Sequence, residues 1–203
     1  MIIELDNVEL YYQSKPILSN LYLKVETNCL TTVIGRNGSG KSSLLGILFG
    51  DIRPKYRLIR IDGVPVTKPL YTLGNIKMLP EFPMTPGHLS IKTAFKKYQV
   101  SWDLFKSFFP EFKPTSDHRF KILSTGERRM LEVFMVLKSR SEIVLLDEPF
   151  KSLSPIVVER FKKLILEEKQ QKVVLCADNR DENWQDIAEQ TYLLQNRTLV
   201  PLA

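Results

Sequence analysis

Apolar and polar residues alternate along the first part of the chain in the way that half-buried strands require. The segments 2–12 and 17–26 show this two-residue period. An Asp-Gly pair at 62–63 is a strong signal for a tight hairpin turn. A helix is predicted at 41–49. The predicted strands are 2–12, 17–26, 30–34, 57–61, 64–66 and 76–79.

Between about residues 83 and 123 the pattern changes, because prolines and aromatic residues become dense. This texture predicts a small, mainly helical lobe. Its aromatic residues include Phe95, Tyr98, Trp102, Phe105, Phe108, Phe109 and Phe112. They form either the lobe's own core or a groove for a helix of a partner protein, and the core is favoured because aromatic residues are commonly buried.

Strands alternate with helices again from residue 124 onward. Helices are predicted at 125–138, 155–169 and 181–189, and strands at 142–147, 172–177, 191–195 and 197–200. This alternation favours an α/β fold, with a mainly parallel sheet covered by helices on both faces and an N-terminal antiparallel β subdomain. We expect one domain over 1–203, with a core lobe at about 1–82 and 124–203 and a helical lobe at about 83–123.

A glycine-rich loop connects the predicted strand 30–34 to the predicted helix 41–49. It matches G-x-x-x-x-G-K-S in full, in the strand-to-helix context that a phosphate-binding P-loop requires. Its backbone N–H groups and the positive end of the helix are suited to phosphate. Lys41 would neutralise the β- and γ-phosphates, and the Ser42 hydroxyl would ligate Mg²⁺. The residues expected to bind nucleotide here are Gly35, Arg36, Asn37, Gly38, Ser39, Gly40, Lys41, Ser42 and Ser43.

Two acids follow the apolar run at 143–146. Asp147, Glu148 and the next proline resemble a Walker B strand that is followed directly by a catalytic glutamate. In this arrangement Asp147 holds Mg²⁺ through water and Glu148 acts as the general base on the attacking water.

The segment 123–127 reads Leu-Ser-Thr-Gly-Glu and resembles the signature loop of the ATP-binding-cassette family. A plain helix cap, with Glu127 three residues after Ser124, is the alternative interpretation. Tyr12 precedes Gly35 by the spacing that the adenine-stacking aromatic residue has in this family, and Tyr11 competes for the role if the register differs by one.

The resemblance covers about residues 1–194 and implies an ATP-binding subunit that hydrolyses Mg-ATP to drive a separate membrane-spanning partner. It implies a head-to-tail dimer with a second nucleotide-binding domain, either another copy or a different cassette subunit. In such a dimer Ser124, Thr125, Gly126 and Glu127 face the γ-phosphate held by the other subunit. The expected location is cytoplasmic, on the inner face of the cell membrane. The alternatives are a regulatory subunit that scarcely hydrolyses ATP and a soluble cassette ATPase.

Three positions depart from the family pattern. Glu81 stands where the family has glutamine, and we expect it to ligate Mg²⁺ as a harder donor. Ser154 stands where an aspartate is usual. Asp178 stands where a histidine contacts the γ-phosphate, and the chain's two histidines, His88 and His118, both lie in the helical lobe. The sequence therefore predicts slow basal hydrolysis, which Asp178→His should accelerate if the loop has the family's geometry.

Composition adds little to this picture. The net charge of +6 fits an anionic partner such as nucleotide, or simply a basic surface. No nucleic-acid partner is expected, because the chain has neither a coiled-coil insertion nor a second cassette. Cys29 and Cys176 lie in apolar runs and are expected to be reduced core residues. The N-terminus lacks a signal-peptide pattern and no apolar run is long enough to span a bilayer, so another chain is expected to supply the membrane part.

Overall fold

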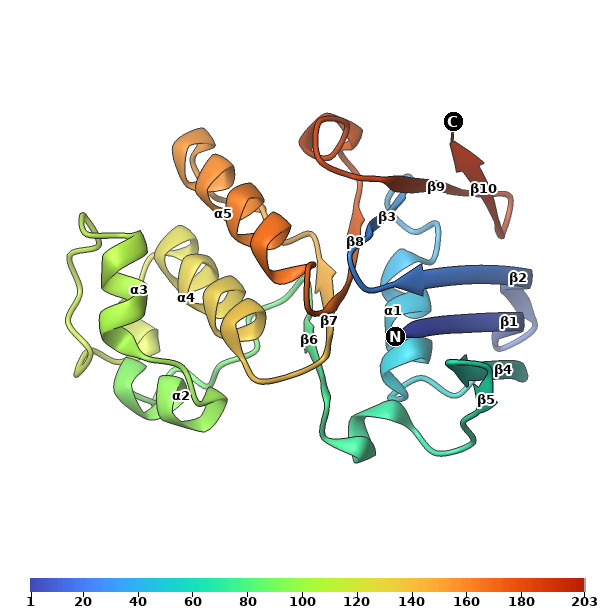
Figure 1. The fold of residues 1–203 in the computed structure, drawn as a ribbon, viewed down its shortest axis with the longest axis horizontal. Coiled ribbons are helices and arrows are strands. Elements are labelled where there is room, and N and C mark those ends of the chain that lie inside the picture. The colour runs from blue at the N-terminus through green and yellow to red at the C-terminus, as the bar shows by residue number, and fades with distance from the viewer. Residues whose placement is uncertain (203) are drawn as a thin grey trace.

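The computed structural model describes residues 1–202, and within them two β-sheets are packed with helices (Figure 1). The strands are β1 (Ile2–Tyr12), β2 (Lys15–Glu26), β3 (Leu30–Ile34), β4 (Tyr56–Ile61), β5 (Val64–Pro65), β6 (Ile76–Leu79), β7 (Ile143–Asp147), β8 (Val173–Asp178), β9 (Gln190–Gln195) and β10 (Thr198–Leu202). The helices are α1 (Lys41–Phe49), α2 (Ile91–Tyr98), α3 (Trp102–Phe108), α4 (Thr125–Lys138) and α5 (Pro155–Glu168), with short 3₁₀ turns η1 (Leu70–Leu73), η2 (Phe120–Ile122) and η3 (Asp181–Asn183).

The larger sheet has six strands in the order β10-β9-β3-β8-β7-β6, and only β10 runs antiparallel to its neighbour. Both of its faces are buried. Ile143 and Leu145 of β7 belong to one apolar cluster, whereas Val144 and Leu146 belong to the other. This division follows from the two-residue period of a strand. The expected mainly parallel sheet with two covered faces is confirmed.

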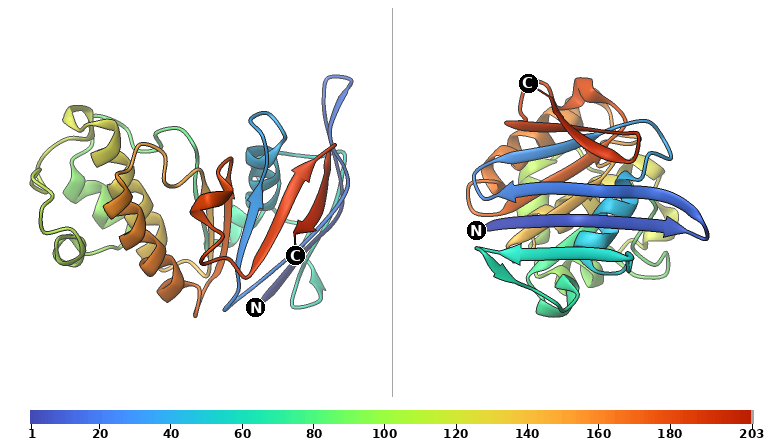
Figure 2. Two further views of the ribbon diagram at one scale, coloured as in Figure 1. Left: turned by 90° about the horizontal axis from the view of Figure 1, so that it is seen from above. Right: turned by 90° about the vertical axis from the view of Figure 1, so that its right-hand side faces the viewer.

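Helix α1 fills the space between this sheet and a four-stranded antiparallel sheet of order β2-β1-β4-β5 (Figures 1 and 2). Leu44, Leu45 and Leu48 are fully buried there. Because β3 leads into α1 through the glycine-rich loop, this packing fixes the loop at the carboxyl edge of the six-stranded sheet. The predicted hairpin is present: Asp62 and Gly63 link β4 to β5, and both have positive φ angles, as a tight two-residue turn requires.

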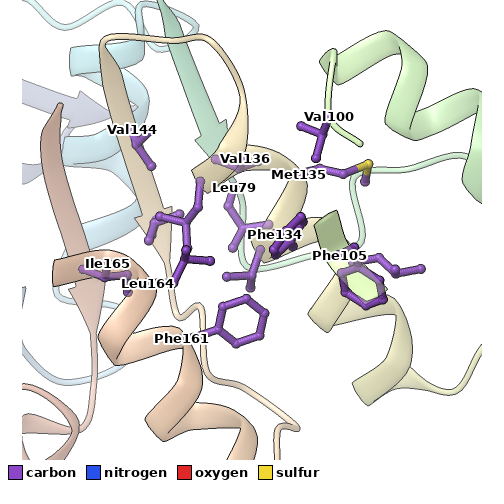
Figure 3. Packing of buried hydrophobic residues seen from close by; sticks show 14 of the residues in the cluster. Leu79, Val100, Phe105, Phe134, Met135, Val136, Val144, Phe161, Leu164 and Ile165 are labelled. Atoms are coloured by element: carbon purple, nitrogen blue, oxygen red, sulfur yellow. The ribbon is translucent and has the colours of Figure 1, made fainter. Parts of the chain in front are cut away.

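Helices α4 and α5 cover the opposite face of the sheet, and α2 and α3 pack beyond them. Figure 3 shows Phe134 of α4 between Leu79 of β6 and Phe105 of α3. One apolar cluster is therefore continuous from the sheet to the helical lobe. Most of the lobe's aromatic rings are buried in this cluster, namely Phe95, Phe105, Phe109 and Phe112. The interpretation of these rings as the lobe's own core is therefore confirmed.

The predicted helix at 181–189 is wrong. The chain makes only the short turn η3 there, because the side chain of Asp178 accepts hydrogen bonds from the segment that follows it. Such local side-chain acceptors compete with helix formation. The other predicted elements agree with the structure to within two residues. Within residues 1–202, no helix combines the length and the apolar composition needed to cross a bilayer.

Candidate nucleotide-binding site

The loop between β3 and α1 has the shape expected of a phosphate cradle. Lys41 is 6% exposed, and its Nζ donates to the carbonyl oxygen of Gly35 at 2.9 Å and to that of Arg36 at 3.3 Å. The ammonium group therefore lies inside the curl of the loop. The hydroxyl of Ser39 is buried and has no hydrogen-bond partner among the described residues, so the loop holds an unused polar group.

Glycine is required at particular places in this loop. Gly38 and Gly40 have φ angles of +78° and +110°, which side chains disfavour, and Gly40 forms the left-handed cap of α1. At Gly35 a Cβ atom would lie 2.8 Å from the carbonyl oxygen of Leu194 in β9. The motif glycines thus let the loop curl tightly against the sheet.

The cleft above this loop collects residues from distant parts of the chain. Those lining it are Tyr12, Ile17, Asn37, Gly38, Gly40, Lys41, Ser42, Ser43, Glu81 and Glu148. Tyr12, at the end of β1, is 49% exposed, and its hydroxyl lies 3.1 Å from the Ser43 Oγ. Tyr11 instead donates its hydroxyl to Glu9. Of the two tyrosines, the structure brings Tyr12 to the phosphate loop.

Asp147, the last residue of β7, is 2% exposed, and its Oδ1 atom has no hydrogen-bond partner within the described chain. Burial raises the pKa of this carboxyl above its ordinary value, and the nearby Ser42 hydroxyl acts in the opposite direction. A buried carboxylate oxygen without a partner is costly. This oxygen is therefore suited to a cation that arrives with the nucleotide.

Glu148 follows with a φ angle of +46°, an unusual conformation for a residue with a side chain. Its N–H donates to the carbonyl oxygen of Ala177 in β8 at 2.8 Å. The side chain of Glu148 is 13% exposed and lines the cleft. The general-base candidate therefore reaches the cavity in which the phosphate loop lies.

Glu81 also reaches the cleft, but its carboxylate is already paired. Lys151 Nζ lies 2.6 Å from Glu81 Oε1 and 4.0 Å from Glu148 Oε2. The hydrogen bond to Glu81 raises the pKa of Lys151. Sequence reasoning missed Lys151, although a lysine three residues after Glu148 is a visible signal. One ammonium group thus lies between two acids of the site.

Asp178, which stands where the family has a γ-phosphate-contacting histidine, has its side chain bound within its own chain. Its carboxylate accepts from Arg180 N at 3.0 Å, Asn183 Nδ2 at 3.3 Å and Trp184 Nε1 at 2.9 Å, and the residue is 4% exposed. These donors hold the carboxylate on the segment that follows β8. Its negative charge is better satisfied there than beside an anion.

The next residue, Asn179, contacts the phosphate loop instead of Asp178. Its Nδ2 donates to Asn37 Oδ1 of the phosphate loop at 3.0 Å. Sequence reasoning missed Asn179, because Asp178, the residue before it, occupies the position of the family's histidine. Asn179 is the first residue after β8, and its side chain has different partners from that of Asp178.

The signature-like segment starts α4 but does not reach the phosphate loop of its own chain. Ser124 and Glu127 form a reciprocal capping box, with distances of 3.2 Å and 2.9 Å. A Cβ atom at Gly126 would lie 2.8 Å from the carbonyl oxygen of Ser152. No residue of 124–127 is among the described residues that line the phosphate-loop cleft. Ser154, the cap of α5, makes no side-chain cap bond.

The six-stranded sheet, the glycine-rich loop before α1 and the acidic end of β7 define the chain as a P-loop nucleotide-binding domain. A family model described as ABC transporter matches residues 18–151, and the chain belongs to this family. It is an ATP-binding subunit of an ABC transporter and an ATPase, of the kind that works with membrane-spanning components.

Individual proteins agree with the family assignment. The chain is similar to the high-affinity branched-chain amino acid transport ATP-binding protein BraG of Pseudomonas aeruginosa, with 28% identity over 98% of this chain and 91% of BraG. It is also similar to the lipopolysaccharide export system ATP-binding protein LptB of Haemophilus influenzae, with 24% identity over 95% of this chain and 86% of LptB. A solved structure of an ATP-binding subunit of an ABC transporter has a TM-score of 0.85 at 17% identity, covering 100% of this chain and 90% of that one, which shows the shared fold.

Proposed function

We propose that the chain binds Mg-ATP in the cleft between Tyr12 and Glu148 and hydrolyses it slowly. The observation that supports this most is the convergence of Lys41, at the start of α1, with Asp147 and Glu148, at the end of β7, on the edge of one sheet. Adenine stacks on the ring of Tyr12, and the triphosphate lies along the residues 35–43, where backbone N–H groups and Lys41 meet its charge.

Ser42 and Asp147 fit a magnesium ion. Both line a common cavity, and Asp147 Oδ1 has no partner among the described residues. Oxygen donors are what this hard cation prefers. When bound, the ion would neutralise charge on the phosphate oxygens. Glu81 is a weaker candidate ligand than the sequence suggests, because Lys151 already holds its carboxylate.

Glu148 accepts the proton of the attacking water in this proposal. Asp178 does not help, since its side-chain oxygens accept hydrogen bonds from the segment 180–184. Losing one well-placed donor to the transition state costs about 10² to 10³ in rate. Basal turnover is therefore slow, and Asp178→His, which would disrupt a buried set of hydrogen bonds, is no longer expected to accelerate it.

Two chains complete each site, because Ser124, Thr125, Gly126 and Glu127 serve the phosphate loop of another subunit. The helical lobe, about residues 83–123, contacts a membrane-spanning partner, and the core lobe, about 1–82 and 124–203, carries the nucleotide. Phe82, which is 70% exposed at the junction of the lobes, is suited to such a contact. The chain then works on the inner face of the cell membrane.

Lys41→Ala tests the site. Hydrogen bonds to charged groups contribute about 1.5–3 kcal/mol, so the ATP dissociation constant should rise about tenfold to hundredfold. Isothermal titration with Mg-ATP measures this change. Lys24→Ala is the matched control, because Lys24 pairs with Glu26 on β2, outside the cleft.

An unchanged dissociation constant in Lys41→Ala would refute the assignment of the phosphate site. Thermal unfolding of both variants is measured in parallel, because Lys41 also braces the loop through Gly35 and Arg36. A variant that unfolds near the wild-type temperature and fails to bind ATP supports the proposal.

A further inference from the structure

The side chain of Arg129, in the second turn of α4, connects this helix to the backbone around Glu148. Its Nη1 donates to the carbonyl oxygen of Pro80 at 2.7 Å, and its Nε donates to that of Pro149 at 3.3 Å. Its Nη2 donates to the carbonyl oxygens of Glu148, at 2.9 Å, and Asp147. Four backbone carbonyls, three of them consecutive, thus meet one guanidinium group.

Arg129 is buried, so its charged group needs hydrogen-bond partners within the protein. Arg129 is 5% exposed, and burial lowers its pKa, while the charges of nearby acids act in the opposite direction. Within residues 1–202 no carboxylate forms an ion pair with it, so the carbonyl dipoles are its direct partners. Only a planar fork of several N–H donors can serve four acceptors at once. The interaction therefore specifies the path of the backbone rather than the identity of neighbouring side chains.

The backbone that Arg129 holds is strained. Glu148 has a φ angle of +46°, and such a conformation costs about 1–3 kcal/mol unless its surroundings enforce it. Three hydrogen bonds hold it here: the N–H of Glu148 donates to Ala177 in β8, and its carbonyl oxygen accepts from Arg129 and from the N–H of Lys151. The direction of the Glu148 side chain follows from this backbone, so Arg129 acts on it without touching it.

We propose that Arg129 is a positioning residue for hydrolysis, which holds Glu148 in its strained conformation and ties its orientation to α4. The same helix begins with the capped segment Ser124–Glu127. A shift of α4 caused by phosphate at that segment would reach Glu148 through one side chain. In a two-chain assembly, the segment Ser124–Glu127 of one subunit would complete the site on the other subunit. Arg129 would then connect that site to the subunit's own site, which contains Glu148. This inference rests on the proposed role of Glu148.

Arg129→Gln and Arg129→Lys test the proposal in the full chain, with Arg128→Gln as the matched control. Arg128 is the neighbouring arginine of the same helix, but it bonds Glu132 and the carbonyl oxygen of Thr85 instead. A small misplacement of a reacting group can cost about 10²-fold in rate, so Arg129→Gln should lower kcat about tenfold to hundredfold. The ATP dissociation constant should stay within about threefold, because the phosphate loop is untouched.

Arg129→Lys keeps the charge with fewer donors, so its kcat should lie between those of wild type and Arg129→Gln. All rates are expressed per ATP-binding site counted by titration, which removes any unfolded fraction. If Arg129→Gln does not fold, Arg129→Lys decides, with an expected loss in kcat of about threefold to tenfold. Wild-type kcat in a folded Arg129 variant, or equal losses in the Arg128 and Arg129 variants, would overturn the inference.

Glu148→Gln separates this inference from the proposed function. Wild-type turnover in Glu148→Gln would remove the general-base assignment itself. Loss of turnover in Glu148→Gln together with full turnover in Arg129→Gln would leave the base assignment standing and reject the positioning role alone.

Discussion

Two adjacent side chains at the end of β8, Asp178 and Asn179, have different partners. Asp178 faces the segment after the strand, where three donors meet its carboxylate, and Asn179 faces the phosphate loop through Asn37. Glu81 likewise has a partner within the chain, because its carboxylate forms an ion pair with Lys151. At the scale of single residues, the role of a substituted side chain depends on which neighbouring group binds it.

Replacing Asp178 should therefore affect stability more than nucleotide binding. In Asp178→Ala the indole N–H of Trp184 and the N–H of Arg180 lose their acceptor, and an unsatisfied buried donor costs about 1–3 kcal/mol. Asn179 is exposed, so Asn179→Ala should change stability by less than about 0.5 kcal/mol. Urea denaturation followed by circular dichroism measures both. Equal stability of the two variants would contradict the assignment of Asp178 as a structural acceptor.

Helix α4 has three different partners along its length. Its first turn is closed by the capping box of Ser124 and Glu127, its second turn carries Arg129, and its later turns bury Phe134. Phe134 packs edge-on against Phe105, with ring centroids 5.2 Å apart. One element thus joins the helical lobe, the sheet and the strained residue after β7, so its packing and the geometry of the site are coupled.

Phe134→Ala should destabilise the chain by about 3–5 kcal/mol, because it removes a fully buried ring from the centre of the apolar cluster. Phe82→Ala is the control: it removes an equal side chain that is 70% exposed, and it should change stability by less than about 0.5 kcal/mol. The difference between the two free energies of unfolding is read from urea titrations. A loss below about 1 kcal/mol in Phe134→Ala would show that the lobe packs more loosely than the structure indicates.

At the scale of the whole molecule, the phosphate loop and the signature-like segment occupy separate surfaces. The cleft lined by Lys41 and Glu148 does not include Ser124 or Gly126 among the described residues. The N-terminus of α4 is open to solvent at Ser124 and Thr125. Glu127 caps the first turn of α4, and the exposed N–H end of the helix is open to a phosphate group held by another chain.

Glu148→Gln should accumulate the ATP-bound state and favour a two-chain assembly, because binding is retained while the proposed base is lost. Size-exclusion chromatography with light scattering, in Mg-ATP, should show twice the monomer mass. The double variant Lys41→Ala with Glu148→Gln should remain monomeric. A monomeric Glu148→Gln chain at high concentration, with ATP bound, would contradict a homodimer and favour a different cassette subunit as partner.

Sequence reasoning predicted the fold well because its strongest signals are local. The two-residue period located β1 and β2, and the glycine-rich motif located the turn into α1. The predictions that failed depend on contacts between side chains, which a hydrophobic pattern does not reveal. The segment 181–189 forms only a short turn, with the side chains of Asn183 and Trp184 bonded to Asp178, and the connection of Arg129 to Glu148 depends on residues far apart in the chain.

The hydrogen bond between Trp184 and Asp178 has an optical consequence. The chain has two tryptophans, and they lie in different environments: Trp102 stacks on Phe105 in the helical lobe, whereas Trp184 stacks on Phe150 at a centroid distance of 4.7 Å. Phe150 lines a cavity together with Asn37 and Glu148. The emission of an indole ring responds to the polarity and motion of its surroundings. A Trp102→Phe chain therefore carries a single tryptophan, which is bonded to Asp178, the neighbour of the residue that contacts the phosphate loop, and its emission reports on this part of the site without any added label.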